Sequence, residues 1–361
     1  MRFLASYKKL TLLFKFDAGT SRGVLKERDS WFIKIKDSKN PLLCGIGEAA
    51  PLKGLSIDFV PYFEEKIKEV CDIINRTDFS INALQSLISE AKLENYPSII
   101  FALETAFLDL SNGGKRIIFD SAFARGLQSI PINGLVWMGE KGFMQKQIKE
   151  KLRTGFTCIK IKVGAIDFET ERQLIEEIRD SYSEKEISIR LDANGAFSVK
   201  DVLDKLSILS KYKIHSIEQP IQPGMHKAMA GLCKTSPIPI ALDEELIGIK
   251  TKEDKAELLD ELNPPYIILK PTLIGGIESS RQWIELAVER KIEWWFTSAL
   301  ESNIGLNAIS QLTSNYTITI QQGLGTGQIF SNNIQSPLHI SSGTLTVSSQ
   351  LPWDLSAIDE L

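Results

Sequence analysis

The sequence predicts an α/β protein that consists of a βα barrel preceded by a smaller α+β unit. Near the start, two β-rich segments come before two amphipathic helical segments, an order typical of a compact α+β unit. From about residue 130, short apolar runs alternate with helix-length amphipathic segments, which is the pattern of successive βα units on a parallel sheet. Eight such runs within about 190 residues favour a closed barrel.

The first unit begins with two predicted strands, at residues 10–16 and 31–36, which are rich in β-forming residues. Helical periodicity follows, because apolar residues recur at steps of three and four over residues 63–74 and again over residues 99–110. The turn-forming stretch 111–115 (SNGGK) ends the second helix and indicates a domain edge.

The second part contains eight predicted strands. They are residues 130–135, 158–163, 187–191, 216–217, 238–242, 266–269, 293–296 and 316–320. A doubly wound open sheet is the alternative, since strand number alone does not distinguish it from a barrel. Two further β-like segments, 338–340 and 344–347, are expected to return to the first unit. The predicted domains are therefore 1–125 (α+β), 126–325 (barrel) and 326–361 (a C-terminal segment that rejoins the first domain).

Composition excludes several functional classes. The 361 residues include 42 Lys+Arg and 46 Asp+Glu, a net charge of −4, and no basic domain is visible, so nucleic acid is not an expected partner. The N-terminus lacks the apolar core of a signal peptide, and no run approaches the ~18 apolar residues of a membrane span. Four scattered cysteines without a CxxC pair are typical of thiols in a reducing cytoplasm. We therefore expect a cytoplasmic protein with a small-molecule partner, no membrane contact and no obligate protein partner.

Charged residues interrupt the apolar strands at a regular interval. One predicted strand contains two lysines, and each of the next four ends beside a single charge. These residues are Lys160, Lys162, Asp192, Glu218, Asp243 and Lys270. Successive strands place their charges 25 to 30 residues apart, which is about one βα unit. Because the C-terminal ends of barrel strands surround one opening, we expect these side chains to meet there.

Three carboxylates at one opening predict a metal site. Asp192, Glu218 and Asp243 would repel and raise one another's pKa unless a cation held them. Oxygen ligands without thiolate or imidazole suit a hard ion, Mg²⁺ or alternatively Mn²⁺. The three histidines of the chain show no metal-ligand spacing, so a zinc site is not expected.

The lysines on both sides of the carboxylates indicate proton abstraction. Lys160 and Lys162 are two residues apart on one strand and so point to the same face. Adjacent ammonium groups disfavour each other's charge, so we expect a lysine pKa lowered toward neutral pH and a lysine that acts as general base. Lys270 lies four strands further and faces this pair across the ring. A substrate carboxylate on the metal would place its α-carbon between the two sides, and the metal would stabilise the resulting enediolate.

The individual features also have structural interpretations. A single acid at a strand end is often a helix N-cap, and a barrel lysine often extends its charge to solvent. The glycine-rich stretch 323–327 (GLGTG) either cradles an anion at a following helix or is a flexible loop. The regular interval favours the functional interpretation, because unrelated surface charges have no reason to recur at the barrel period.

These residues resemble the enolase superfamily, with its KxK strand, its Asp, Glu and Asp metal ligands on the following strands and its lysine on the sixth strand. Within the superfamily the sequence is most similar to the o-succinylbenzoate synthases of menaquinone biosynthesis, of the type found in Bacteroidetes-like bacteria. The similarity spans nearly the whole chain. It lies in residues 19–25 (GTSRGVL), 45–51 (GIGEAAP), 131–139 (PINGLVWMG), 190–197 (RLDANGAF), 270–272 (KPT) and 298–308 (SALESNIGLNA).

The resemblance implies a modified (β/α)₇β barrel under a capping domain built from both ends of the chain. It implies the Mg²⁺-dependent loss of water from 2-succinyl-6-hydroxy-2,4-cyclohexadiene-1-carboxylate to give o-succinylbenzoate. Lys162 would remove the proton and return it to the departing hydroxyl on the same face. Lys270 would be the stabilising cation on the opposite face, and Lys160 would support the base and the substrate carboxylate.

The resemblance also implies roles for surrounding residues. Asn194 and Arg190 would support the metal ligands, and Ser298 and Glu301 would shape the pocket. The loop 19–23, including Ser21 and Arg22, would close over the succinyl arm and exclude water.

Two other functions remain as alternatives. An N-acylamino acid racemase or dipeptide epimerase of the same superfamily would use Lys162 and Lys270 as an acid–base pair on opposite faces. Dipeptide epimerases resemble one another in an Asp-x-Asp pair on the eighth strand, where this sequence has GLG at 323–325, which counts against that activity. A barrel that only binds a metal or ligand is the third alternative, and lysines on both sides of the site argue against it.

Overall fold

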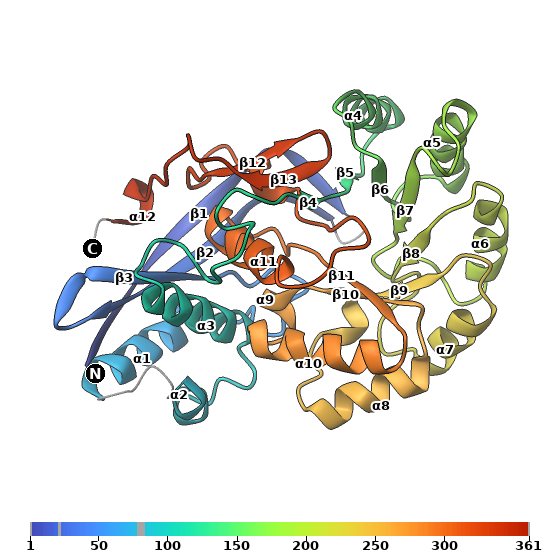
Figure 1. The fold of residues 1–361 in the computed structure, drawn as a ribbon. Coiled ribbons are helices and arrows are strands. Elements are labelled where there is room, and N and C mark those ends of the chain that lie inside the picture. The colour runs from blue at the N-terminus through green and yellow to red at the C-terminus, as the bar shows by residue number, and fades with distance from the viewer. Residues whose placement is uncertain (1, 21–22, 78–83, 360–361) are drawn as a thin grey trace.

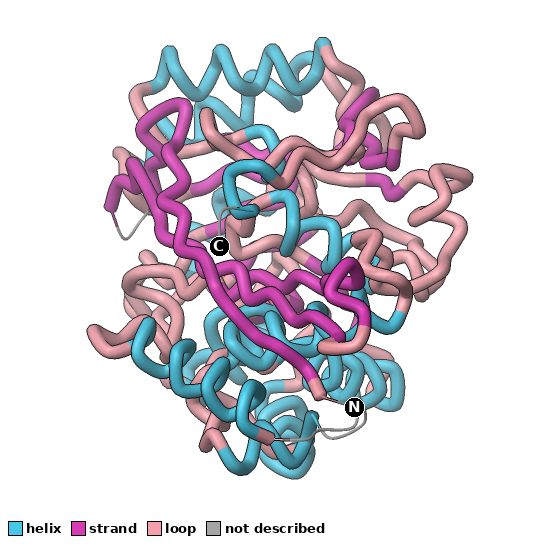
Figure 2. Tube along the Cα trace, turned by 90° about the vertical axis from the view of Figure 1, so that its left-hand side faces the viewer, coloured by secondary structure: helices cyan, strands magenta, loops and turns pink. Residues whose placement is uncertain are grey.

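The first part of the chain is a three-stranded antiparallel sheet covered by helices (Figures 1 and 2). The computed structural model describes residues 2–20, 23–77 and 84–359. Its first strands are β1 (Phe3–Thr20), β2 (Gly23–Asp37) and β3 (Asn40–Ala49), paired in that order. The helices are α1 (Phe63–Arg76), α2 (Leu84–Glu90) and α3 (Pro97–Ser111). We call these six elements the N-terminal unit.

The predicted strand-then-helix order of this unit is confirmed, and so are both helices found from their periodicity. β1 and β2 are much longer than predicted, at 18 and 15 residues. Their additional residues form a half-exposed ribbon in which charged and apolar residues mix, so the apolar alternation of a strand is weak there. Helix α3 packs directly on β3 because Gly47 has no side chain; a Cβ there would lie 1.8 Å from the Ala102 carbonyl oxygen.

The second part is a ring of parallel strands surrounded by helices (Figure 1). Its sheet runs in the order β11-β10-β9-β8-β7-β6-β5. The strands are β5 (Gly134–Val136), β6 (Cys158–Lys162), β7 (Ser188–Asp192), β8 (Ser216–Glu218), β9 (Ile240–Leu242), β10 (Tyr266–Leu269) and β11 (Glu293–Phe296). The helices are α4 (Lys141–Arg153), α5 (Phe168–Ser181), α6 (Val202–Ser210), α7 (His226–Thr235), α8 (Lys252–Leu262), α9 (Pro271–Ile274), α10 (Gly276–Glu289) and α11 (Asn303–Thr313).

The strand order excludes the doubly wound alternative, because it follows the sequence without the reversal that such folds require. The ring closes through two single bridges, in which Gln322 pairs with Ile132 and Gly323 pairs with Thr297. The modified barrel fold is therefore confirmed.

The predicted eighth strand at 316–320 is wrong. The closing element is the pair Gln322–Gly323, which we call the closing strand, and residues 316–320 form a connection without strand pairing. The β-forming composition of 316–320 misled the prediction, whereas closure depends on a close approach: a Cβ on Gly323 would lie 2.3 Å from the Thr297 hydroxyl oxygen. The predicted first barrel strand is also divided, since β4 (Ile130–Pro131) belongs to another sheet.

That other sheet contains the C-terminal hairpin of β12 (Leu338–Ser341) and β13 (Thr344–Val347). β13 pairs with β4 at the barrel, so the predicted return of this hairpin to the N-terminal unit is wrong. Chain segments on both sides of the hairpin do contact that unit: Phe330 pairs with Phe14, and α12 (Ser356–Asp359) lies against β1. The domain boundaries themselves stay a prediction.

Buried charged residues of the N-terminal unit hold the loop that follows β11. The Arg28 guanidinium donates to the carbonyl oxygens of Ala299 and Ala50. The Glu48 carboxylate accepts hydrogen bonds from the backbone N–H groups of Ser302 and Gly305, each at 2.9 Å, at the start of α11. These contacts fix one wall of the barrel opening from outside the barrel.

Glu104 on α3 is a second link between the two parts. Its carboxylate accepts hydrogen bonds from the backbone N–H groups of Ile277 and Glu278 at the N-terminus of α10. Burial raises the pKa of Glu104 to about 7 from an ordinary value of 4.5, and the two backbone hydrogen bonds offset only part of this.

We expect Glu104→Gln to reduce the pH dependence of stability. The folded protein holds the Glu104 proton more tightly than the unfolded chain, so the free energy of unfolding falls as pH rises from about 4.5 to about 7. This one carboxyl accounts for a loss on the order of 3 kcal/mol. Urea unfolding of both proteins at pH 5 and pH 8 measures the difference. An equal change between the two pH values in wild type and variant would contradict the assignment.

Among the described residues, no helix is both long and apolar enough to cross a lipid bilayer. The cytoplasmic location stays a prediction.

Candidate active site

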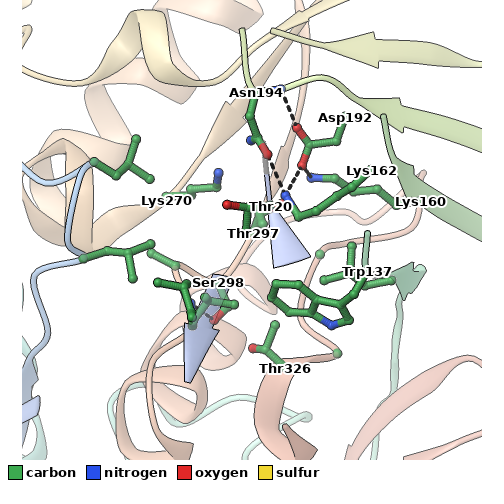
Figure 3. A pocket seen from close by; sticks show the side chains of 18 of the residues that line it. Thr20, Trp137, Lys160, Lys162, Asp192, Asn194, Lys270, Thr297, Ser298 and Thr326 are labelled. Carbon is green, nitrogen blue, oxygen red and sulfur yellow. Dashed lines mark hydrogen bonds and ion pairs between the residues drawn. The ribbon is translucent and has the colours of Figure 1, made fainter. Parts of the chain in front are cut away.

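A cavity of about 320 Å³ lies at the opening of the barrel, between the barrel and the N-terminal unit (Figure 3). The barrel contributes residues at the C-terminal ends of its strands. The N-terminal unit contributes Thr20, Gly23, Val24 and Leu25 from the β1–β2 ribbon, and residues 52–55 follow β3. A backbone bridge between Gly19 and Met138 fastens the ribbon to the barrel. The opening is therefore covered by the N-terminal unit.

Of the six charged residues predicted from the strand period, Lys160, Lys162, Asp192 and Lys270 line this cavity, and Glu218 and Asp243 lie behind them in contact with Lys160 and Lys270. Lys162, Asp192 and Glu218 are partners in register across β6, β7 and β8. Asp243 directly follows β9 and Lys270 directly follows β10. All six residues are at most 8% exposed. Figure 3 shows Lys270 on the opposite side of the cavity from Lys160 and Lys162.

Ion pairs link these residues into a chain. The Lys162 ammonium lies 2.8 Å from Asp192 Oδ2, and the Lys160 ammonium lies 3.0 Å from the same atom and also contacts Glu218. Lys270 contacts Asp243, and its ammonium lies 3.7 Å from Glu218 Oε1. Asp192 and Glu218 therefore share the Lys160 ammonium, and Glu218 and Asp243 share the Lys270 ammonium.

The electrostatics correct one expectation. Burial lowers the pKa of Lys160, but Asp192 and Glu218 outweigh it and hold that pKa above its ordinary value. The pKa of Lys270 is likewise raised, because Asp243 and Glu218 outweigh burial. For Lys160 this is the opposite of the lowering expected for one lysine of the Lys160–Lys162 pair. The carboxylates that contact Lys160 outweigh the effect of the neighbouring ammonium groups.

The carboxylates respond in opposite directions. Burial raises the pKa of Asp192, but Lys160 and Lys162 outweigh it and the pKa lies below its ordinary value. Burial raises the pKa of Asp243 well above its ordinary value; Lys270 opposes this rise, and Glu244 and Glu218 add to it.

The donor set fits a hard divalent cation. Asp192, Glu218 and Asp243 offer only oxygen atoms, the preferred ligands of Mg²⁺. The buried Glu218 Oε1 atom accepts no hydrogen bond among the described residues. Among the described residues, no three Asp, Glu, His or Cys side chains form a ready group of metal ligands. The carboxylates of the site contact the lysines instead.

Two predicted supporting residues lie at different depths. Asn194, in the left-handed region at φ 45°, accepts from Lys162 at 2.9 Å and donates to Glu244 at 3.1 Å, so it belongs to the site. Arg190 lies one layer deeper in the barrel, where it donates to the Gln321 carbonyl oxygen and stacks 4.1 Å from the Trp295 ring. It supports the barrel floor.

Ser298 and Glu301 form a buried pair at the end of β11. Ser298 lines the cavity, and its hydroxyl donates to Glu301 Oε2 at 2.6 Å. Glu301 is fully buried and also accepts from the Thr272 hydroxyl. The Ser298 hydroxyl is thus already engaged inside the protein. Ser21 and Arg22 lie outside the described residues.

Sequence reasoning missed several residues that line the cavity. Asn133, Thr297 and Thr326 contribute polar side chains, and the Trp137 ring lies 6.0 Å from the Lys162 ammonium. Strand alternation could have indicated Thr297: it is two residues after the inward-facing Trp295, so its side chain points to the same face. The glycine-rich stretch contributes Gly323 and Gly325 to the wall and is followed only by the three-residue 3₁₀ helix η2 (Thr326–Gln328), so it does not begin an anion-binding helix.

Comparison with known proteins identifies the family. A family model described as enolase C-terminal domain-like matches residues 144–351, more than half of the chain. The chain belongs to the enolase superfamily.

Within the superfamily, the chain is 45% identical to an o-succinylbenzoate synthase of Desulfotalea psychrophila, over 95% of this chain and 98% of that protein. The crystal structure of MenC from the same organism matches with a TM-score of 0.86 and 40% identity, covering 96% of this chain and all of the other. A dipeptide epimerase from Enterococcus faecalis, solved with Mg and a dipeptide, matches at a TM-score of 0.82 and only 19% identity over 99% of both chains. This last neighbour shares the fold.

Proposed function

We propose that the chain converts 2-succinyl-6-hydroxy-2,4-cyclohexadiene-1-carboxylate to o-succinylbenzoate and water, a step of menaquinone biosynthesis. The observation that supports this proposal is the 45% identity to the Desulfotalea psychrophila enzyme over almost the entire length of both chains. The four described cysteines, none in a disulfide, agree with an enzyme of the cytoplasm.

Lys162 is the proposed base. Its amine takes the proton from the carbon next to the ring carboxylate, and it then gives this proton to the hydroxyl that leaves as water from the same face. Loss of the proton and the hydroxyl makes the ring aromatic. Asn194, 2.9 Å from the Lys162 nitrogen, holds the amine in position.

Lys270 is the proposed stabilising cation. It lies on the other side of the cavity, and its contacts with Asp243 and Glu218 favour the charged form. A cation on that face stabilises the negative charge that develops as the proton leaves. Lys160, held between Asp192 and Glu218, orients both carboxylates and supports the base.

Asp192, Glu218 and Asp243 are the proposed ligands of Mg²⁺, or alternatively of Mn²⁺. The bound ion would supply positive charge to the substrate carboxylate. The end of the closing strand and the two residues after it are Gly323-Leu324-Gly325, where a carboxylate pair would be needed to bind a substrate ammonium, so a dipeptide is the less suitable substrate.

The direct test is an assay of the purified protein with Mg²⁺ and the cyclohexadiene substrate. We expect the ultraviolet absorbance of the aromatic product to appear with turnover, because aromatisation makes the dehydration strongly favourable. N-succinylamino acids and dipeptides are incubated in parallel and followed by polarimetry. Racemisation or epimerisation without formation of the aromatic product would contradict the proposal.

A further inference from the structure

Three polar side chains in the cavity have atoms without a partner in the protein. Asn133 Oδ1, Thr297 Oγ1 and Thr326 Oγ1 are buried and form no hydrogen bond among the described residues. Their side chains are 4%, 8% and 5% exposed, and all three residues line the cavity. A buried polar atom without a partner destabilises a fold, so each such atom in a native structure calls for an explanation.

These three residues gather around the closing strand. Thr297 pairs with Gly323, and the Asn133 backbone N–H donates to the Gln322 carbonyl oxygen at 2.9 Å. Thr326 is three residues after the end of the strand, next to Gly325, where a Cβ would lie 3.4 Å from the Asn133 carbonyl oxygen. A side chain at Gly323 would collide with the Thr297 hydroxyl, so this position of the closing strand requires a glycine.

The rim of the barrel is thereby divided into two arcs. The charged residues lie at β6 to β10, and the three unpartnered atoms lie on the remaining arc from β11 through the closing strand to the segment before β5. In Figure 3, Thr326 and Ser298 lie at one side of the cavity and Asp192 and Asn194 at the other. A ligand that spans the cavity therefore meets both the charged residues and these neutral hydrogen-bonding groups.

We call the arc with the three unpartnered atoms the neutral arc. Its side chains can donate hydrogen bonds to the oxygen atoms of a ligand without adding charge. A threonine hydroxyl donates one hydrogen bond, and the Asn133 amide presents an oxygen or, after a half turn about its last side-chain bond, a nitrogen donor. The neighbouring Ser298 does not offer this, because its hydroxyl already donates to Glu301. The substrate of the proposed reaction has a succinyl arm with a ketone and a carboxylate, both of which accept hydrogen bonds.

We propose that Asn133, Thr297 and Thr326 form the subsite that binds the oxygen atoms of the succinyl arm and so determines substrate specificity. This inference rests on the proposed function, since it assigns the arm of that substrate to the neutral arc and the ring carboxylate to the charged arc.

The test compares two ligands on the Mg²⁺-loaded protein by calorimetry: o-succinylbenzoate, which has the arm, and benzoate, which lacks it. We expect Thr297→Val and Thr326→Val each to weaken o-succinylbenzoate binding about fivefold, and the double variant about 25-fold, with benzoate binding unchanged. KM for the substrate should rise by similar factors while kcat changes little. Because neither hydroxyl has a partner in the protein, both variants should fold with at least wild-type stability.

Two controls make the result specific. Thr297→Ser keeps the hydroxyl and should retain most of the binding. Thr313→Val removes a buried hydroxyl that donates to the Ile309 carbonyl oxygen on α11, away from the cavity. This variant should leave the affinity for both ligands unchanged. Equal binding of o-succinylbenzoate by wild type and valine variants would overturn the subsite, as would an equal loss for both ligands. A wild-type protein that neither binds o-succinylbenzoate nor forms it would instead overturn the proposed function, and the subsite with it.

Discussion

Lys162→Ala should lower the rate of o-succinylbenzoate formation by about a thousandfold or more, with product affinity nearly unchanged. The variant removes the group that we assign to both proton transfers, and a single positioned acid or base contributes about a hundred- to ten-thousandfold. The fold should survive, because Asp192 keeps its ion pair with Lys160 at 3.0 Å and no buried carboxylate is left alone. Product formation is followed by absorbance, and product affinity by calorimetry.

Lys200→Ala is the matched control for this variant. Lys200 is an exposed lysine outside the cavity, so its removal tests whether the loss of one positive charge alone has an effect. We expect wild-type kinetics. If Lys162→Ala retained a tenth of the wild-type kcat, Lys162 would not be the base.

Chelation with EDTA should abolish turnover. Added Mg²⁺ or Mn²⁺ should restore turnover in the wild-type protein but not in the Glu218→Gln variant. Glu218 is the middle carboxylate of the three and contacts both Lys160 and Lys270, so its charge is central to any cation held there. The glutamine side chain keeps the volume and removes the charge. We expect kcat/KM to fall at least about a hundredfold, because an essential charge-stabilising group is lost.

A second readout separates metal binding from catalysis. Mg²⁺ should raise the Tm of the wild type, since a ligand that binds only the folded state stabilises it, and should leave the Tm of Glu218→Gln almost unchanged. Glu293→Gln, which alters an exposed acid at the opposite end of β11, serves as the control. Full activity of the wild type after thorough chelation would rule out the metal role.

The sequence predicted the charged part of the site well, for a geometric reason. Parallel neighbours stay in register, so charges that recur once per βα unit must come together, as Lys162, Asp192 and Glu218 do. Contacts between side chains could not be predicted in this way. Which lysine contacts which carboxylate decides the direction of each pKa shift, and this depends on distances of about 3 Å that strand spacing does not define.

The neutral part of the site was harder to predict from sequence. Ser298 and Thr297 are adjacent hydroxyl residues, and the difference between them comes from Glu301, which accepts from Ser298 and also from Thr272 on α9. The position of barrel closure was mispredicted because local β propensity at 316–320 is stronger than at Gln322–Gly323, where the absence of a side chain decides the pairing.

The contacts of Arg28 and Glu48 with the loop after β11 have a consequence for protein engineering. A chimera that exchanged only the N-terminal unit for that of a related enzyme would remove the partners of the Ala299 carbonyl oxygen and of the first amides of α11. Segment 298–305 would then have to be transferred together with the N-terminal unit of the same related enzyme. This wall of the barrel opening is therefore one structural module made of two distant pieces of chain.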